Sequence, residues 1–335
     1  MFKPFETTGI GSLPFTDPEE AVKLVLEGCD IPFWPQLPKR SFKEYMIPQY
    51  CEGFPCIEVD EEKKQVSLKA TTQEDLNAFY EAISKGEAFP ISGDFAAGFY
   101  AFKEALKKGS TYAIKGQITG PLTFSLGLKD PEGRYLYFNE ELREIALMLL
   151  SAKARWQIEV LKEYAEQVIM FIDEPILSAL GSSSYLGVST DEAGRMLKTL
   201  VEEIHSAGAI SGIHCCGKAD WALVIETGVK ILNFDAFDYF DAFNAYSGEI
   251  ASFVQRGGLI AWGIIPTTDA INTTSLDKLK EKLTGQIETL GRVLPVDTIK
   301  SHSLLTPSCG AGSRTVQEAR RVFQLLVSLK EAMLS

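Results

Sequence analysis

Two fragments that lie far apart in the sequence carry residue types that bind soft metal ions. His214, Cys215 and Cys216 stand together in the first fragment, and Cys309 stands in the second. On an extended segment, residues two apart project from the same face, so His214 and Cys216 can reach one ion. Imidazole and thiolate ligands suit zinc, and three protein ligands leave a fourth position open for chemistry. The spacing therefore predicts a zinc site of His214, Cys216 and Cys309, with Cys215 pointing into packing.

The same residues also have a purely structural interpretation. Unpaired cysteines are among the most buried residue types and often act as small apolar groups. A zinc ion closed by four protein ligands would likewise serve the fold rather than catalysis. An exchangeable coordination position therefore separates a catalytic site from a structural one.

The composition is that of an ordinary globular protein. The 335 residues are 45% hydrophobic and 23% charged, which provides enough apolar surface for a large core. A net charge of -12 argues against a nucleic-acid partner, because phosphate binding depends on clustered Lys and Arg.

The cysteine content and the hydropathy pattern indicate the compartment. Six cysteines in irregular positions do not form the dense framework of a small secreted protein. No charged region followed by a long apolar stretch opens the chain, and no run reaches the roughly 18 apolar residues of a membrane span. We expect a cytoplasmic protein with no membrane partner, in which the thiols of Cys216 and Cys309 stay reduced.

The elements that position these residues alternate between strand and helix. From about residue 165 onward, short runs rich in Val, Ile and Phe alternate with longer helical patterns. The predicted strands are Gln167–Ile172, Ala209–Cys216, Lys230–Asp235, Leu259–Ile265 and His302–Thr306. The predicted helices are Thr190–Ser206, Asp220–Thr227, Gly248–Arg256, Leu276–Leu290 and Thr315–Met333. Repeated strand-helix units imply a parallel sheet.

The first half of the chain is less regular. Its predicted strands are Thr7–Gly11, Pro32–Pro35 and Thr111–Ile118, and its predicted helices are Pro18–Glu27, Gln73–Ser84, Ala97–Lys107 and Glu140–Tyr164. About eight strand-helix units predict an α/β fold of the (β/α)8 TIM-barrel type, with an insertion between residues 40 and 110, in the N-terminal third. We expect one barrel domain over residues 1–335, and a doubly wound open sheet is the alternative.

The barrel prediction places the candidate site residues together. Active sites of these barrels lie at the C-terminal ends of the strands. The residues expected at that end are Ser12, Asp173, Glu174, His214, Cys216, Asp235 and Cys309.

Motifs along most of the chain resemble a known superfamily. It comprises cobalamin-independent methionine synthase, uroporphyrinogen decarboxylase and the corrinoid:thiol methyltransferases. The similar segments, in chain order, are Thr7–Ser12, Gly120–Thr123, Ile172–Pro175, His214–Gly217 and Cys309–Gly310. The complete His-x-Cys and Cys set is similar to the methyltransferase branches, because the decarboxylase branch does not use it.

The resemblance implies roles for individual residues. Ser12 would hold the carboxylate of homocysteine, Asp173 its amino group, and Glu52 would be a second partner of that amino group. In the family a Glu on the strand after His-x-Cys is a further zinc ligand, and Asp235 stands at the matching position here. This shorter carboxylate could coordinate directly, bind through water, or leave a site of three ligands. Without the resemblance, Ser12 would be interpreted as a turn residue and Asp173 as a helix cap.

The resemblance also implies a reaction and its alternatives. The folate-dependent methionine synthase has two barrels, and its N-terminal barrel has no counterpart here, so the expected methyl donor is methylcobalamin or another methylcorrinoid, free or on a corrinoid protein. The expected function is zinc-dependent methyl transfer to a thiol, with homocysteine the preferred acceptor in methionine biosynthesis. One alternative is a methyltransferase for another thiol such as coenzyme M. Another is a non-catalytic homologue with structural zinc that binds a corrinoid protein.

Overall fold

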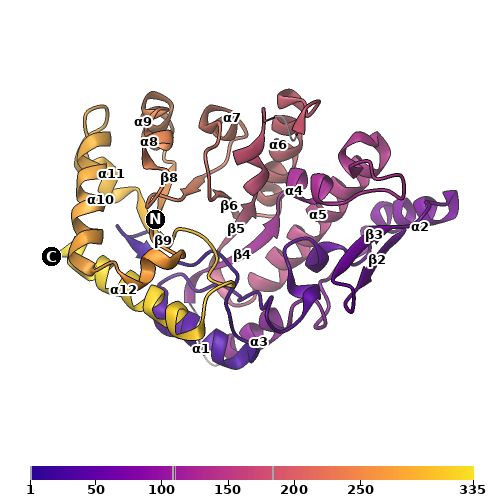
Figure 1. The fold of residues 1–335 in the computed structure, drawn as a ribbon, viewed down its shortest axis with the longest axis horizontal. Coiled ribbons are helices and arrows are strands. Elements are labelled where there is room, and N and C mark those ends of the chain that lie inside the picture. The colour runs from indigo at the N-terminus through magenta and orange to yellow at the C-terminus, as the bar shows by residue number, and fades with distance from the viewer. Residues whose placement is uncertain (1, 108, 110, 183–184) are drawn as a thin grey trace.

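Seven parallel strands form one sheet that curls into a barrel wall (Figure 1). The computed structural model describes residues 2–107, 109, 111–182 and 185–335. The strand order is β1-β9-β8-β7-β6-β5-β4, and neighbouring strands pair in parallel throughout. The strands are β1 (Glu6–Thr7), β4 (Thr111–Thr119), β5 (Ala165–Asp173), β6 (Ile210–Cys215), β7 (Ile231–Phe234), β8 (Leu259–Ile265) and β9 (Ser303–Pro307).

An extended segment, residues 31–36, joins the two edges of this sheet. On one side, the amide of Ile31 donates to the carbonyl of Thr7 in β1 at 3.0 Å. On the other side, the amide of Lys115 in β4 donates to the carbonyl of Pro32 at 2.8 Å. Residues 31–36 therefore occupy the place of the eighth strand, and the predicted (β/α)8 TIM-barrel class is confirmed.

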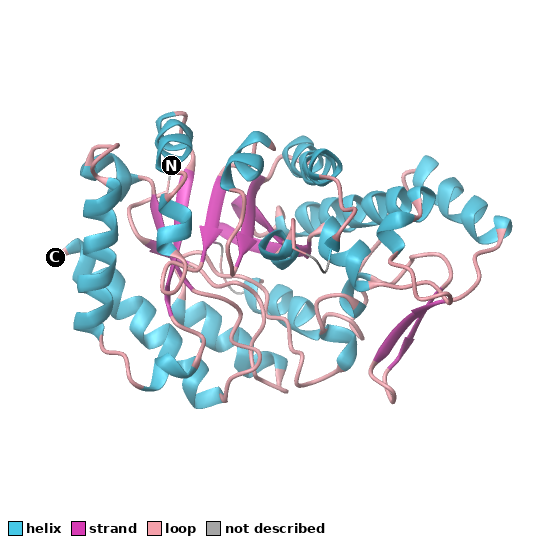
Figure 2. Cartoon of the chain, turned by 45° about the horizontal axis from the view of Figure 1, so that its top comes forward, coloured by secondary structure: helices cyan, strands magenta, loops and turns pink. Residues whose placement is uncertain are grey.

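Helices cover the outer face of the sheet, as Figure 2 shows. They are α1 (Pro18–Gly28), α3 (Ala97–Leu106), α4 (Pro121–Gly127), α5 (Glu140–Leu161), α6 (Thr190–Ser206), α7 (Trp221–Glu226), α8 (Phe240–Asn244), α9 (Ser247–Gln255), α10 (Leu276–Leu290), α11 (Val296–Ser301) and α12 (Val316–Leu334). Polar side chains that accept hydrogen bonds from the first-turn amides define many of their N-termini. Such caps are Asp17, Asn139, Ser189, Asp220, Ser275 and Thr315. No described helix is long and apolar enough to cross a membrane.

The predicted insertion is present between the eighth-strand segment and α3. It contains the short 3-10 helices η1 (Phe42–Glu44) and η2 (Pro48–Tyr50), a two-stranded hairpin and α2 (Gln73–Ser84). The hairpin pairs β2 (Ile57–Asp60) with β3 (Gln65–Leu68) in antiparallel fashion and lies on the right-hand side in Figure 1, next to α2. The sequence did not predict this hairpin, because its strands are short and only partly buried.

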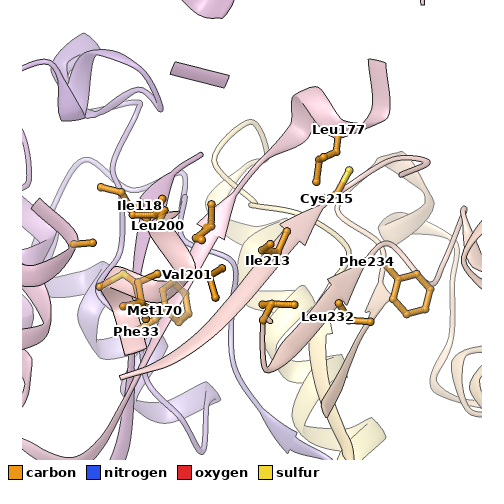
Figure 3. Packing of buried hydrophobic residues seen from close by; sticks show 14 of the residues in the cluster. Phe33, Ile118, Met170, Leu177, Leu200, Val201, Ile213, Cys215, Leu232 and Phe234 are labelled. Carbon is orange, nitrogen blue, oxygen red and sulfur yellow. The ribbon is translucent and has the colours of Figure 1, made fainter. Parts of the chain in front are cut away.

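The strands alternate between two apolar clusters with a period of two. Met170 and Ile172 of β5 belong to the large cluster between sheet and helices, part of which Figure 3 shows. Ile169 and Phe171 belong to a second cluster whose buried members come only from the strands and from residues 31–36, so it fills the barrel. Asp173 continues this inward row, which brings its carboxylate to the C-terminal end of the barrel.

The predicted strand Thr7–Gly11 is regular only over Glu6–Thr7. The backbone of Gly9 lies against the ring of Phe33, where an added Cβ would be 2.2 Å from a ring carbon. The carbonyl of Ile10 accepts from the side chain of Lys115 at 2.9 Å and not from a neighbouring strand. This side-chain contact replaces the ladder and ends β1 early.

Candidate metal centre

Three soft donors meet at the C-terminal end of the barrel. His214 is near the end of β6, Cys216 follows that strand, and Cys309 follows β9. One ligand atom from each lies within 4.8 Å of the other two. The structure therefore brings together the three residues that the sequence predicted as zinc ligands.

Asn233 of β7 fixes the orientation and tautomer of His214. The Nδ2 group of Asn233 donates to the carbonyl of Ala261 at 2.9 Å and to Oγ1 of Thr306 at 2.8 Å. A carbonyl only accepts, so Oδ1 of Asn233 must face the imidazole, where Nδ1 of His214 lies 2.5 Å away. Nδ1 therefore carries the proton. Nε2 is buried without a hydrogen-bond partner among the described residues, and in the neutral ring its lone pair can bind a metal ion.

The two thiols share one hydrogen-bonded arrangement. Hydrogen bonding from Cys309, in first place, holds the pKa of Cys216 well below the usual range of a thiol. The same hydrogen bond and burial raise the pKa of Cys309. Cys216 is thus stabilised as a thiolate, the form that binds a metal ion. This donor set of one neutral imidazole and two sulfurs fits zinc.

Cys215 differs from its neighbour Cys216, as the alternation along a strand predicts. Its side chain is fully buried in the large apolar cluster, and Figure 3 shows it near Leu177. Burial raises the pKa of Cys215 to about 12. The predicted packing role of Cys215 is confirmed.

Asp235 lies near this centre without joining the group of three donors. Its Oδ1 accepts from the amide of Asp238 at 2.9 Å. Burial, in first place, raises the pKa of Asp235 to about 6. Within the described residues, the group whose ligand atoms all lie within 4.8 Å of one another is His214, Cys216 and Cys309, so Asp235 is not part of this group and its role as a ligand stays a prediction.

A cavity of ≈ 370 Å³ opens above the three donors. Ser12 and Asp173, two of the three substrate-binding residues predicted from the sequence, both line it together with His214, Cys216 and Cys309. Five of the predicted site residues therefore meet in one cavity, although they come from four parts of the chain.

Asp173 lines this cavity and has one buried carboxylate oxygen that is unpaired. The residue is 4% exposed, and its Oδ1 has no hydrogen-bond partner in the described part of the chain. Burial raises the pKa of Asp173 to about 6, against the attraction of His214 and Lys115. An unpartnered buried carboxylate oxygen is costly, and a cationic or N–H group of a ligand would satisfy it.

Ser12 packs against the loop that carries Cys309. Its Oγ accepts from the amide of Gly312 at 3.3 Å, and its carbonyl accepts from the amide of Ala311 at 2.8 Å. A Cβ on Gly310 would lie 2.1 Å from Oγ of Ser12. Glycine at position 310 is thus required by the close approach of these two segments.

Glu52 lies elsewhere. Its carboxylate accepts from the amide of Ser92 at 2.7 Å, and Glu52 does not line the cavity. The insertion instead contributes Glu44, which is 1% exposed and accepts from the amide of Leu37 at 3.0 Å. Burial raises the pKa of Glu44 to about 7.

Gln36 is a cavity residue that sequence reasoning missed. Its Nε2 donates to Oε1 of Gln49 at 2.5 Å, and Gln49 in turn donates to the carbonyl of Phe95 at 2.7 Å. This chain fixes the amide of Gln36, and its Oε1 lies over Gly11, where a Cβ would come within 2.4 Å. Only its position could have identified Gln36 from the sequence, because Gln36 lies at the end of the segment that serves as the eighth strand.

The comparisons with known proteins show a fold. No model of a known protein family matches the sequence, and no curated protein matches it. A solved B12-independent methionine synthase from Shewanella sp. W3-18-1, in complex with selenomethionine, is similar with a TM-score of 0.56 and 13% identity. The match covers 99% of this chain and 98% of that chain. At this identity the likeness shows a shared barrel.

A second similar structure is more distant. It is the tandem catalytic modules of the pneumococcal exo-beta-D-N-acetylglucosaminidase, with a TM-score of 0.46 and 13% identity over 97% of this chain and 84% of that chain.

Proposed function

We propose that this protein is a zinc-dependent methyltransferase that methylates a thiol, with homocysteine as the preferred acceptor and methionine as the product. The observation that carries the proposal is the shared cavity: three soft donors stand beside an unpaired carboxylate oxygen of Asp173 and the hydroxyl of Ser12. A thiol that also carries an amino acid end would satisfy all of these groups at once.

The metal would supply the activation of the thiol. A free thiol has a pKa near 8.5 and is mostly protonated at neutral pH, and zinc coordination would hold it as a nucleophilic thiolate. The chain's own contribution is the free Nε2 of His214 together with the two sulfurs. Three protein donors leave a coordination position for a substrate, which favours a catalytic site over a closed structural one.

The other cavity residues would bind and orient the amino acid end. The carboxylate of Asp173 would accept from the substrate ammonium, and Oε1 of Gln36 offers a second acceptor on the same cavity wall. Ser12 would donate to the substrate carboxylate through its hydroxyl. Holding the acceptor at both ends would restrict the sulfur to one position. Such positioning of a reacting group can supply a large part of the rate acceleration of an enzyme.

The buried Asp173 also discriminates between acceptors. Coenzyme M carries a sulfonate and no amino group, so it would leave the Asp173 oxygen unpaired and bring a second negative charge into the cavity. The methionine synthase of similar fold was solved with selenomethionine, an amino acid thioether analogue of the proposed product. Both points support homocysteine over coenzyme M.

The methyl donor proposed is a methylcorrinoid, free or bound to a corrinoid protein. The described residues form one barrel, and the donor is carried over from the resemblance to the corrinoid:thiol methyltransferases. The similar Shewanella enzyme is described as B12-independent and is matched over 98% of its chain. Methyltetrahydrofolate is therefore the alternative methyl donor that must be tested beside methylcobalamin.

The test is a methyl-transfer assay with the zinc-loaded protein. Methylcobalamin is mixed with homocysteine or with coenzyme M, and loss of the methyl-cobalt absorbance is followed together with thioether formation by mass spectrometry. We expect methionine from homocysteine, a much slower reaction with coenzyme M, and none with Cys309→Ala. Transfer from methyltetrahydrofolate alone would overturn the corrinoid donor, and the absence of methionine with every donor would overturn the proposed reaction.

A further inference from the structure

A fully buried lysine lies inside the barrel below the cavity. Lys115 of β4 has 0% exposure and stands two residues after Ala113, a member of the apolar cluster that fills the barrel. No carboxylate of the described residues forms an ion pair with its ammonium. Burial lowers the pKa of Lys115 to about 8, against the attraction of Asp173. A buried charge without an ion-pair partner costs stability. The position of the Lys115 ammonium inside the barrel therefore indicates a role beyond packing.

The ammonium of Lys115 is held by four contacts. Nζ donates to the carbonyl of Ile10 at 2.9 Å and to Oε1 of Gln117 at 3.1 Å. It also lies 4.7 Å from the ring centroid of Phe171 and 5.4 Å from that of Phe33. Carbonyl acceptors and aromatic faces together replace the water that the ammonium gives up.

These contacts connect Lys115 to two segments that form the cavity. Ile10 lines the cavity and precedes Ser12 by two residues, at the point where β1 has already ended. Gln117 donates through Nε2 to the carbonyl of Trp34 at 2.9 Å, two residues before Gln36. The ammonium therefore supports residues 10–12 and, through Gln117, residues 34–36.

The two segments also depend on each other. The amide of Gln36 donates to the carbonyl of Gly11 at 3.0 Å, and the amide of Leu13 donates to the carbonyl of Gln36 at 2.9 Å. Neither segment forms a regular strand here. Hydrogen bonds from the side chains of Lys115 and Gln117 therefore supplement the few backbone hydrogen bonds that hold the two segments. Without the ammonium, the buried carbonyl of Ile10 would lose the partner that fixes the approach to Ser12.

We propose that Lys115 is a positioning residue, which holds residues 10–12 and 34–36 in place and thereby sets the affinity of the cavity for the polar end of the thiol substrate. This inference rests on the proposed function for its substrate. The metal donors lie on other elements, so Lys115 acts on substrate affinity and leaves zinc binding unchanged.

The first test measures the two segments directly and needs no substrate. Lys115→Met is compared with Lys153→Met, because Lys153 is also 0% exposed and donates to a backbone carbonyl, that of Pro90, outside the cavity. In Lys115→Met we expect amide hydrogen exchange at Leu13 and Gln36 to rise on the order of tenfold. Lys153→Met leaves both amides at the wild-type rate. Equal exchange at these amides in the wild type and Lys115→Met overturns the proposal.

The second test measures homocysteine binding to the zinc-loaded proteins by calorimetry. We expect Lys115→Met to bind homocysteine about tenfold more weakly, with unchanged zinc content and an unchanged spectrum of the cobalt-substituted site. Lys115→Gln keeps a hydrogen-bond donor without the charge, so its affinity for homocysteine should lie between those of the wild type and Lys115→Met. It replaces Lys115→Met in this test if that variant does not accumulate as folded protein. Wild-type affinity in Lys115→Met overturns this role of Lys115. If the wild type binds no homocysteine, the proposed acceptor fails, and amide exchange alone decides the proposal about Lys115.

Discussion

Nδ1 of His214 and Oδ1 of Asn233 are 2.5 Å apart inside the barrel, and in the neutral imidazole this contact places the proton on Nδ1 and the lone pair on Nε2. A leucine at position 233 would remove the acceptor that selects this tautomer. We expect Asn233→Leu to bind zinc about 10- to 100-fold more weakly. Competition with a chromophoric chelator measures the affinity, and Asn233→Asp, which keeps an acceptor, serves as the control. An unchanged affinity in Asn233→Leu would show that the contact does not tune the site.

The adjacent cysteines Cys215 and Cys216 provide a matched pair for testing the metal ligands. We expect purified Cys216→Ala and Cys309→Ala to contain little zinc, because each change removes one of three soft donors. Cys215→Ala should keep a full zinc equivalent, since that thiol packs in the apolar cluster. Metal analysis of the three proteins checks this. Full zinc retention in Cys309→Ala contradicts the site.

The residues predicted to bind the amino acid end should separate substrate affinity from metal binding. Asp173→Asn removes the charge proposed to pair with the substrate ammonium, and a hydrogen bond to a charged group contributes about 1.5 to 3 kcal/mol. We therefore expect KM for homocysteine to rise about 10- to 100-fold with no loss of zinc. Ser12→Ala should act in the same direction. With coenzyme M as the acceptor, Asp173→Asn should react no more slowly than the wild type, and a large loss there would point to a general structural defect.

Lys153 should make the stability of the protein depend on pH in the alkaline range. Burial lowers the pKa of Lys153 from 10.5 to about 8, so the unfolded chain binds more protons than the folded protein between these values. The free energy of unfolding therefore gains from this group as pH rises from 8 to 10.5, by at most about 1.4 kcal/mol per pH unit. Urea denaturation of wild type and Lys153→Met at several pH values measures the difference. Lys198→Met, on an exposed face of α6, is the control and should follow the wild type.

Much of the barrel follows from hydrophobic periodicity. Long helices such as Thr190–Ser206 and Leu276–Leu290 have the predicted bounds, because an apolar stripe and a polar cap mark both their face and their start. Strand Leu259–Ile265 also has the predicted bounds, since it is a continuous apolar run. The sequence does not mark α4, α8 or α11, which are too short for a helical period to be visible.

Some residues of the candidate site can likewise be predicted from the sequence, and others cannot. The cysteines and His214 carry a spacing that is visible in the sequence, whereas Glu52 was selected by its resemblance and lies against Ser92. Gln36 has no chemical signature of its own. Its importance comes from long-range contacts with Gly11 and Gln49, and those follow from barrel closure. Local pattern therefore identifies donors, and only the three-dimensional fold identifies the residues that hold them.

The metal donors come from two places in the sheet, beside β6 and beside β9, with β7 and β8 between them. A bound ion would therefore act as a crosslink across the C-terminal half of the barrel, and it would bind the folded chain far better than the unfolded one. Mass action then makes unfolding dependent on metal supply, with about 2.7 kcal/mol gained at a free zinc concentration a hundred times the Kd. Zinc limitation would thus reduce the lifetime of the protein as well as its activity.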